Sequence, residues 1–141
     1  MGLAGLWGRL FRKHRDVRSF EQDVAARGGV VGMVDRGYKE VPVEKIVGSV
    51  SRWQNLRSDF FYRSGKVTAR FVRVGQAMRQ GKSLPPLELY KVKPKGEESQ
   101  YYVVDGHHRV AIAKQLDQGE LDAHVVEHRV AGERPEEPKQ G

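Results

Sequence analysis

Residues 101–116 read Tyr-Tyr-Val-Val-Asp-Gly-His-His-Arg-Val-Ala-Ile-Ala-Lys-Gln-Leu. The apolar run 101–104 is typical of a strand, and it stops at the turn-forming pair Asp105 and Gly106. Apolar side chains then recur three residues apart, which is typical of a helix. The sequence therefore predicts that a strand passes directly into a helix N-terminus at residues 105–109.

Such a helix start suits an anion, because backbone N–H groups point outward there and the helix dipole is positive. Arg109 can bind a phosphate bidentately, and Gly106 allows the backbone to approach a ligand closely. His107 and His108 can contact the same phosphate. Arg52, from an Arg- and aromatic-rich stretch upstream, can form the opposite wall. We predict a phosphate or nucleotide site made of these five residues.

Two of these positions are also candidate catalytic residues. His108 can act as an acid or base, since the ordinary pKa of histidine is about 6.5. Asp105 can hold Mg²⁺ on a nucleotide or orient a histidine. Structural alternatives stay open: Asp105 as a turn former, His108 as a helix cap or core residue, and Arg109 in a surface ion pair. His107 and Asp105 alone do not define a metal site, so none is predicted.

The stretch around Arg52 also contains Trp53, Arg57 and Arg63. Interleaved arginines and aromatic residues can stack on a nucleotide base, so these three residues can complete the opposite wall. The alternative is a solvated loop with Trp53 buried in the core.

The chain has 141 residues, a formal net charge of +7 and no cysteine. Its length matches one domain, and the positive charge favours anionic partners such as nucleotides or nucleic acid. Without cysteine there is no disulfide, thiolate metal site or cysteine nucleophile, and the cytoplasm is the simplest location. No apolar run approaches the roughly 20 residues of a membrane span, and no secretory signal is recognised.

Residues 1–18 form a basic segment with apolar residues at helical spacing. The apolar residues are Leu3, Leu6, Trp7, Leu10 and Phe11, and the basic ones are Arg9, Arg12, Lys13, Arg15 and Arg18. A basic amphipathic helix can lie on a membrane or on protein. We favour packing on the protein's own body or on a second subunit. Packing on a second subunit would make the protein a homo-oligomer.

Hydrophobic spacing and turn residues predict the remaining elements. Helices are expected at 19–27, 66–80 and 108–117, and strands at 41–47, 87–92, 101–105 and 123–128. The Gly-rich stretch 28–40, the stretch 48–64 and the turn 93–100 are expected to be loops.

This order predicts an α+β fold, a small mixed β-sheet with packed helices. The expected organisation is a basic N-terminal arm and short helix (1–40), a folded domain (41–130) and a disordered tail (131–141).

Four of these segments resemble the ParB/sulfiredoxin-like superfamily. They are Val-Pro-Val-Glu-Lys-Ile from residue 41, Met-Arg-Gln-Gly from residue 78, Pro-Leu-Glu-Leu-Tyr-Lys-Val from residue 86, and Val-Val-Asp-Gly-His-His-Arg-Val-Ala-Ile-Ala from residue 103. The resemblance covers roughly residues 41–128. It implies a compact domain that binds nucleotide phosphates on the loop after the strand. The DGHHR loop looks most like those of the free serine kinases and of the uncharacterised ParB-like branches.

The chain also departs from the members of that superfamily. Sulfiredoxins carry a cysteine where this chain has His107, so their reductase chemistry is excluded. Partition proteins continue into a helix-turn-helix region, and we expect none in the thirteen residues after His128. Serine kinases use an acidic base early in the domain, whereas residues 47–55 contain no carboxylate.

The sequence therefore predicts a ParB-like protein that binds a nucleotide, ATP, ADP or CTP with Mg²⁺. Any activity would be kinase-like phosphoryl transfer or nuclease-like hydrolysis. The alternative is a non-enzymatic nucleic-acid-binding or assembly protein that uses its basic surface.

Overall fold

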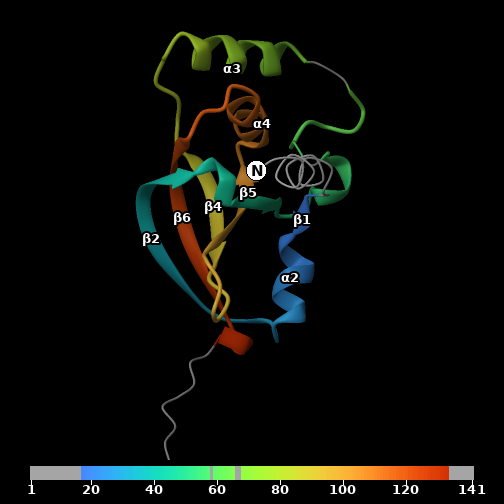
Figure 1. Cartoon of the computed structure of the whole chain (residues 1–141), viewed down its shortest axis with the longest axis vertical. Helices are drawn as coiled ribbons and strands as arrows, with labels where there is room; N and C mark the ends of the chain where they lie inside the picture. The colour runs from blue at the N-terminus through green and yellow to red at the C-terminus, as the bar shows by residue number, and fades with distance from the viewer. Residues whose placement is uncertain (1–16, 58, 66–67, 134–141) are drawn as a thin grey trace, which may run out of the picture.

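A six-stranded mixed sheet organises the computed structural model, which describes residues 17–57, 59–65 and 68–133. The strand order is β1-β3-β5-β4-β6-β2, so β1 and β2 form the two edges (Figure 1). The strands are β1 (Arg18–Ser19), β2 (Val30–Pro42), β3 (Ile46–Ser49), β4 (Leu87–Val92), β5 (Gln100–Asp105) and β6 (Glu120–Val130). The α-helices are α2 (Phe20–Ala26), α3 (Ala69–Arg79) and α4 (His107–Gln115), and the 3-10 turns are Val43–Lys45, Trp53–Asn55 and Ala131–Glu133.

The sheet contains both parallel and antiparallel strand pairs, and its first two pairs, β1 with β3 and β3 with β5, are parallel. β5 pairs parallel with β3 and antiparallel with β4, while β6 pairs parallel with β4 and antiparallel with β2. The α+β prediction with a mixed sheet and packed helices is therefore confirmed. Within the described residues, no helix is long and apolar enough to span a bilayer.

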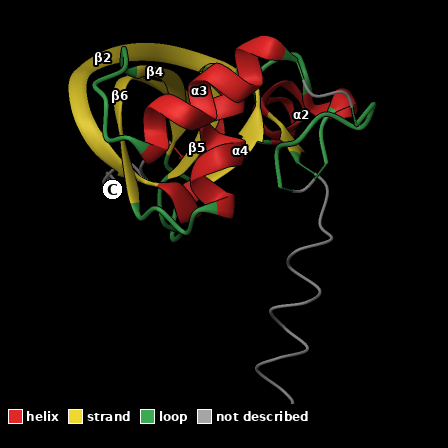
Figure 2. Cartoon of the chain, turned by 90° about the horizontal axis from the view of Figure 1, so that it is seen from above, coloured by secondary structure: helices red, strands yellow, loops and turns green. Residues whose placement is uncertain are grey.

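The main core lies between the sheet and the pair α3 and α4, which cover the same face (Figure 2). Val103, Leu89 and Val125 from three neighbouring strands pack there against Val110 of α4. A smaller cluster on the other face forms around Phe20 of α2. Because β5 is central and buried, its end holds the start of α4 in a fixed place.

The prediction of a loop at residues 28–40 is wrong. Val30–Pro42 is a strand that pairs with β6 along nearly its whole length, so the sheet begins well before residue 41. Its hydrophobic pattern is weak, because β2 is an exposed edge strand with little to bury. The register shifts around Gly32 and Gly37 mark β-bulges, which explains why glycines occur inside a strand.

Other expected elements are present with changed limits. The predicted strand 41–47 is divided, since β2 ends at Pro42 and β3 begins at Ile46 after a 3-10 turn. The last strand is longer than predicted, from Glu120 to Val130. Ser19 caps α2 as expected, its hydroxyl oxygen accepting a hydrogen bond from the Gln22 N–H at 3.1 Å. The tail 134–141 and residues 1–16 lie outside the described residues.

Candidate phosphate-binding site

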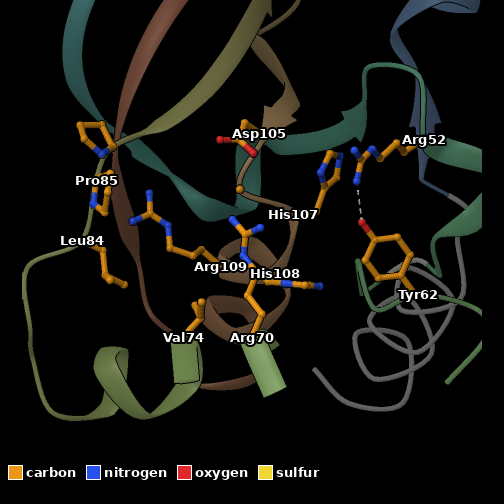
Figure 3. Close-up of a pocket in the computed structure, with 12 residues that line it drawn as sticks. Arg52, Tyr62, Arg70, Val74, Leu84, Pro85, Asp105, His107, His108 and Arg109 are labelled. Carbon is orange, nitrogen blue, oxygen red and sulfur yellow. Dashed lines mark hydrogen bonds between the residues drawn. The ribbon is translucent and has the colours of Figure 1, made fainter. Parts of the chain in front are cut away.

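A cavity of about 250 Å³ lies where β5 passes into α4, between the loop after β3 and helix α3 (Figure 3). Six residues that the sequence predicts for the site line this cavity, namely Arg52 and Asp105 to Arg109. Its lining consists of Arg52, Tyr62, Arg70, Val74, Leu84, Pro85, Pro86, Asp105, Gly106, His107, His108 and Arg109. The fold therefore brings Arg52 to the central loop across more than fifty residues of sequence.

Gly106 occupies a position that only glycine fits. It is the N-cap of α4 with φ of +113°, and a Cβ there would collide with the side chain of Leu87. No side chain in the described part of the chain caps this helix end, so the first N–H groups of α4 are left for another acceptor.

Three guanidinium groups line the cavity against a single carboxylate. Arg52 comes from the loop after β3, Arg70 from α3 and Arg109 from α4. The Arg52 Nη1 donates a hydrogen bond to the Tyr62 hydroxyl at 3.1 Å, which fixes it at the wall. Partial burial lowers the pKa of Arg109, but an arginine stays charged at any ordinary pH. The cavity is therefore strongly cationic.

His107 is a buried wall residue with one ring nitrogen already engaged. Its Nε2 and the Ser49 Oγ are 2.8 Å apart in a buried hydrogen bond that joins α4 to β3. Burial, reinforced by the charge of Arg52, lowers the pKa of His107 to about 4. At neutral pH His107 is thus an uncharged positioning residue, not the cationic phosphate ligand that its place in the motif favours.

His108 lies on the cavity side between two aromatic rings. The ring centroids of Tyr62 and Phe71 are 5.6 and 5.2 Å from that of His108, both in edge-on contact. Burial and the nearby Arg70 and Arg52 lower its pKa, so the imidazole is neutral at pH 7. A neutral imidazole can accept a proton, which fits a general base better than a permanent cation.

Asp105 is the exposed last residue of β5 and, among the residues with described positions, the only carboxylate that lines the cavity. It lies near Arg109, whose charged form it favours. Among the residues that the structure describes, no three His, Asp or Glu side chains are grouped to hold a metal ion. A single carboxylate is nevertheless enough to bind Mg²⁺ that arrives with a nucleotide.

The predicted opposite wall is only partly present. Arg57 forms an ion pair with Asp59 at 2.7 Å, and Arg63 donates a hydrogen bond to the Gln54 carbonyl. Neither lines the cavity, and Trp53 packs against the main core instead. Trp53 is half-buried at the edge of that core and not inside it, and of these four residues Arg52 alone lines the cavity.

Sequence reasoning did not assign Tyr62 or Arg70 to the site. Arg70 lies in the first turn of α3, a helix that the apolar spacing does predict. How close Arg70 comes to α4 depends on the tertiary packing of the two helices, which the sequence pattern does not give. The apolar side of the cavity, Leu84 and Pro85, was also missed, because loop residues before a strand carry no signal of their own.

Comparison with known proteins gives likenesses of fold only. No protein-family model and no curated protein matches the chain. Among solved structures, a Pnob8-like ParB-N domain matches 70% of this chain with 15% identity and a TM-score of 0.41, over 32% of its own length. Sulfiredoxin from Arabidopsis thaliana matches 65% of this chain with 18% identity and a TM-score of 0.43, over 86% of its own length.

Proposed function

We propose that this protein binds the phosphate groups of a nucleotide in the cavity at the start of α4. The observation that carries the proposal is that Arg52, Arg70 and Arg109 line a cavity at the N-terminus of α4. Among the described residues, Asp105 is the one carboxylate that lines it. Guanidinium groups and free backbone N–H groups are the donors that phosphate oxygens prefer. ATP, ADP or CTP with Mg²⁺ supplies these oxygens.

The lining of the cavity combines cationic and apolar residues. Leu84, Pro85 and Val74 supply the apolar surface, and Figure 3 shows the Arg109 side chain extending toward Leu84 and Pro85. The phosphates would contact the arginines, and the sugar or base would pack on the apolar residues. Asp105 would contact the accompanying Mg²⁺.

If the protein is an enzyme, the neutral His108 is the candidate base. A hydroxyl group or water would give its proton to His108 and attack the phosphorus, and the P–O bond to the leaving group would break. The leaving group is the nucleoside diphosphate in kinase-like transfer, and a sugar oxygen that takes up a proton from water in nuclease-like hydrolysis. Positioning and charge supply most of the rate in such reactions, so the three arginines would stabilise the transferring group. This scheme covers both kinase-like transfer and nuclease-like hydrolysis.

Thermal unfolding with a panel of nucleotides tests the binding proposal. ATP, ADP, CTP and GTP with Mg²⁺ are compared on the wild type, Arg109→Ala, Arg70→Ala and Arg73→Ala. A ligand at a hundred times its Kd stabilises the folded state by about 2.7 kcal/mol, which raises Tm by several degrees. Loss of one charge-assisted contact, about 1.5–3 kcal/mol, should weaken binding roughly ten- to hundredfold in the first two variants.

Arg73 is the matched control, because it lies one turn from Arg70 on α3 and does not line the cavity. Arg73→Ala should keep the wild-type response. The proposal is wrong if no nucleotide raises the Tm of the wild type. It is also wrong if Arg73→Ala and Arg70→Ala lose the nucleotide-dependent rise in Tm to the same extent.

A second candidate function is binding of nucleic acid, favoured by the exposed Arg70, Arg73 and Arg79 on α3. This surface continues outward from the cavity and would contact several phosphates at once. Such binding weakens steeply as salt rises, with a slope set by the number of phosphates contacted. Arg73→Ala would also weaken the binding of nucleic acid, whereas nucleotide binding in the cavity should be unchanged in this variant.

A further inference from the structure

Helix α3 is packed on the rest of the protein far less tightly than α4. Of the eleven residues of α3, all of which the structure describes, Gly75 alone is buried, whereas five of the nine residues of α4 are buried. The apolar stripe of α3, Phe71, Val74 and Met78, is only half-buried. Figure 1 shows α3 at one end of the molecule, with α4 between it and the sheet. Elements with few buried contacts open locally at a low cost in free energy.

The position of the cavity explains this loose packing. Arg70 and Val74 of α3 line the cavity, so part of the helix faces the cavity and not the side chains of α4. The contacts that α3 does make with α4 are few. The Phe71 ring centroid is 5.2 Å from that of His108, and a Cβ at Gly75 would lie 3.5 Å from Cδ1 of Ile112. A compound bound in the cavity would therefore add contacts between the two helices.

We propose that α3 is a lid that closes over the phosphate groups of a nucleotide in the cavity. This inference rests on the proposed function and adds a control of access to the same site. Arg70 links the lid to the ligand, because it is the guanidinium that α3 brings to the cavity. When α3 opens, the site loses this cation together with Val74. The cavity therefore binds phosphate tightly only when α3 is closed.

An opened α3 is expected to lose its helical structure. Isolated helices shorter than about 12–15 residues are marginal in water, and α3 has eleven residues with the weak helix former Gly75 among them. On its C-terminal side, residues 80–86 form neither helix nor strand and can follow the movement. Opening should therefore expose the backbone amides of α3 to exchange with solvent.

Hydrogen–deuterium exchange of the full chain tests the lid. In the free protein, peptides from α3 should exchange markedly faster than peptides from α4. The nucleotide is Mg·ATP, or the member of the thermal-unfolding panel that gives the largest rise in Tm. By linkage, it should slow the exchange of α3 by the factor by which closure tightens binding, roughly ten- to hundredfold for the contact of Arg70. Exchange of α2, which does not line the cavity, should be unchanged.

Gly75→Ala gives a variant with a stabilised lid. Alanine fits at this position, because its Cβ would lie 3.4 Å from the flexible end of the Arg79 side chain and 3.5 Å from Ile112. Alanine favours a helix over glycine by a factor of roughly five, so exchange of α3 in the free protein should slow about fivefold. Since release of the nucleotide requires opening, dissociation of a fluorescent mant-nucleotide in stopped flow should slow as well.

The matched control is Gly119→Ala, which makes the same change before β6, where a Cβ would meet nothing within 4 Å. This variant should leave both the exchange of α3 and the dissociation rate as they are in the wild type. Equal slowing of α3 exchange in Gly75→Ala and Gly119→Ala contradicts local opening of the helix.

Two further results would overturn the lid and leave nucleotide binding intact. One is exchange of α3 as slow as that of α4 in the free protein, which makes α3 a rigid wall. The other is a nucleotide that raises the Tm of the wild type but leaves the exchange of α3 unchanged. Failure of every nucleotide to raise the Tm is a distinct result, which removes the proposed function and the lid together.

Discussion

At the scale of single residues, the site depends on Gly106 more than on any charged group. Its positive φ and its contact with Leu87 set the direction in which α4 leaves the sheet. The direction of α4 in turn determines where His108 and Arg109 lie. The glycine in the motif is therefore a packing requirement as well as a backbone one.

Gly106→Ala is expected to destabilise the protein by more than Gly96→Ala. Both glycines have positive φ, which costs an alanine about 1–2 kcal/mol, but a Cβ at Gly96 would meet nothing within 4 Å. The additional collision at Gly106 should add a further loss of about 1–3 kcal/mol. Urea unfolding of the two variants measures the difference, and equal losses would show that Leu87 adjusts freely.

The depressed pKa of His107 predicts a dependence of stability on pH. Its folded pKa of about 4 lies below the ordinary value of 6.5, so the unfolded chain takes up the proton first. The titration of His107 should leave the free energy of unfolding unchanged above pH 6.5, and should lower it as the pH falls from 6.5 toward 4. Urea unfolding across that range measures the slope, and His107→Gln should flatten it. If His107→Gln shows the same pH dependence as the wild type, groups other than His107 cause that dependence.

The same residues show what sequence reasoning can reach. Asp105 to Arg109 were predicted as one unit because they are contiguous and the strand-to-helix pattern around them is strong. Arg70 and Tyr62 were not assigned, since their proximity depends on how α3 and the preceding loop fold over α4. The burial that makes His107 neutral is likewise a tertiary effect that no local pattern reveals.

At the scale of elements, hydrogen bonds of His124 join β2 to two other strands of the sheet, and we call this arrangement the clasp. His124 of β6 donates to the Glu88 carboxylate of β4 at 2.8 Å and to the Asp35 carboxylate of β2 at 2.9 Å. Because ionised carboxylates only accept hydrogen bonds, both contacts require the doubly protonated imidazolium. The clasp spans three strands.

This clasp should open as the pH rises. Hydrogen bonds to Glu88 and Asp35 raise the pKa of His124, so its stabilising contribution is complete below the ordinary value of 6.5. That contribution is lost as the pH rises through the folded pKa. NMR titration of the imidazole should give a pKa above 6.5 that falls in Asp35→Asn. A titration at or below the ordinary value would show that the clasp is absent in solution.

At the scale of the whole molecule, charge is divided between two regions. Three arginines line the cavity at the start of α4, whereas carboxylates lie on the opposite face of the sheet, on β2, β4 and β6. These carboxylates are those of Asp35, Glu40, Glu88, Glu120 and Asp122. Composition gave only the sum of these charges, a net +7, and so predicted a basic surface without its acidic counterpart. The mixed sheet was predictable from the order of elements. The group of carboxylates was not, because β2 was taken for a loop.

The bulges of β2 have a consequence for how the protein behaves at high concentration. A thirteen-residue edge strand with exposed Val31 and Met33 offers unpaired backbone groups to neighbouring molecules. The irregularity at Gly37, whose φ is +75°, interrupts the flat ladder that cross-β stacking requires. Gly37→Val should favour a regular strand and shorten the lag time of thioflavin-positive fibril growth, whereas the native bulge keeps concentrated solutions clear.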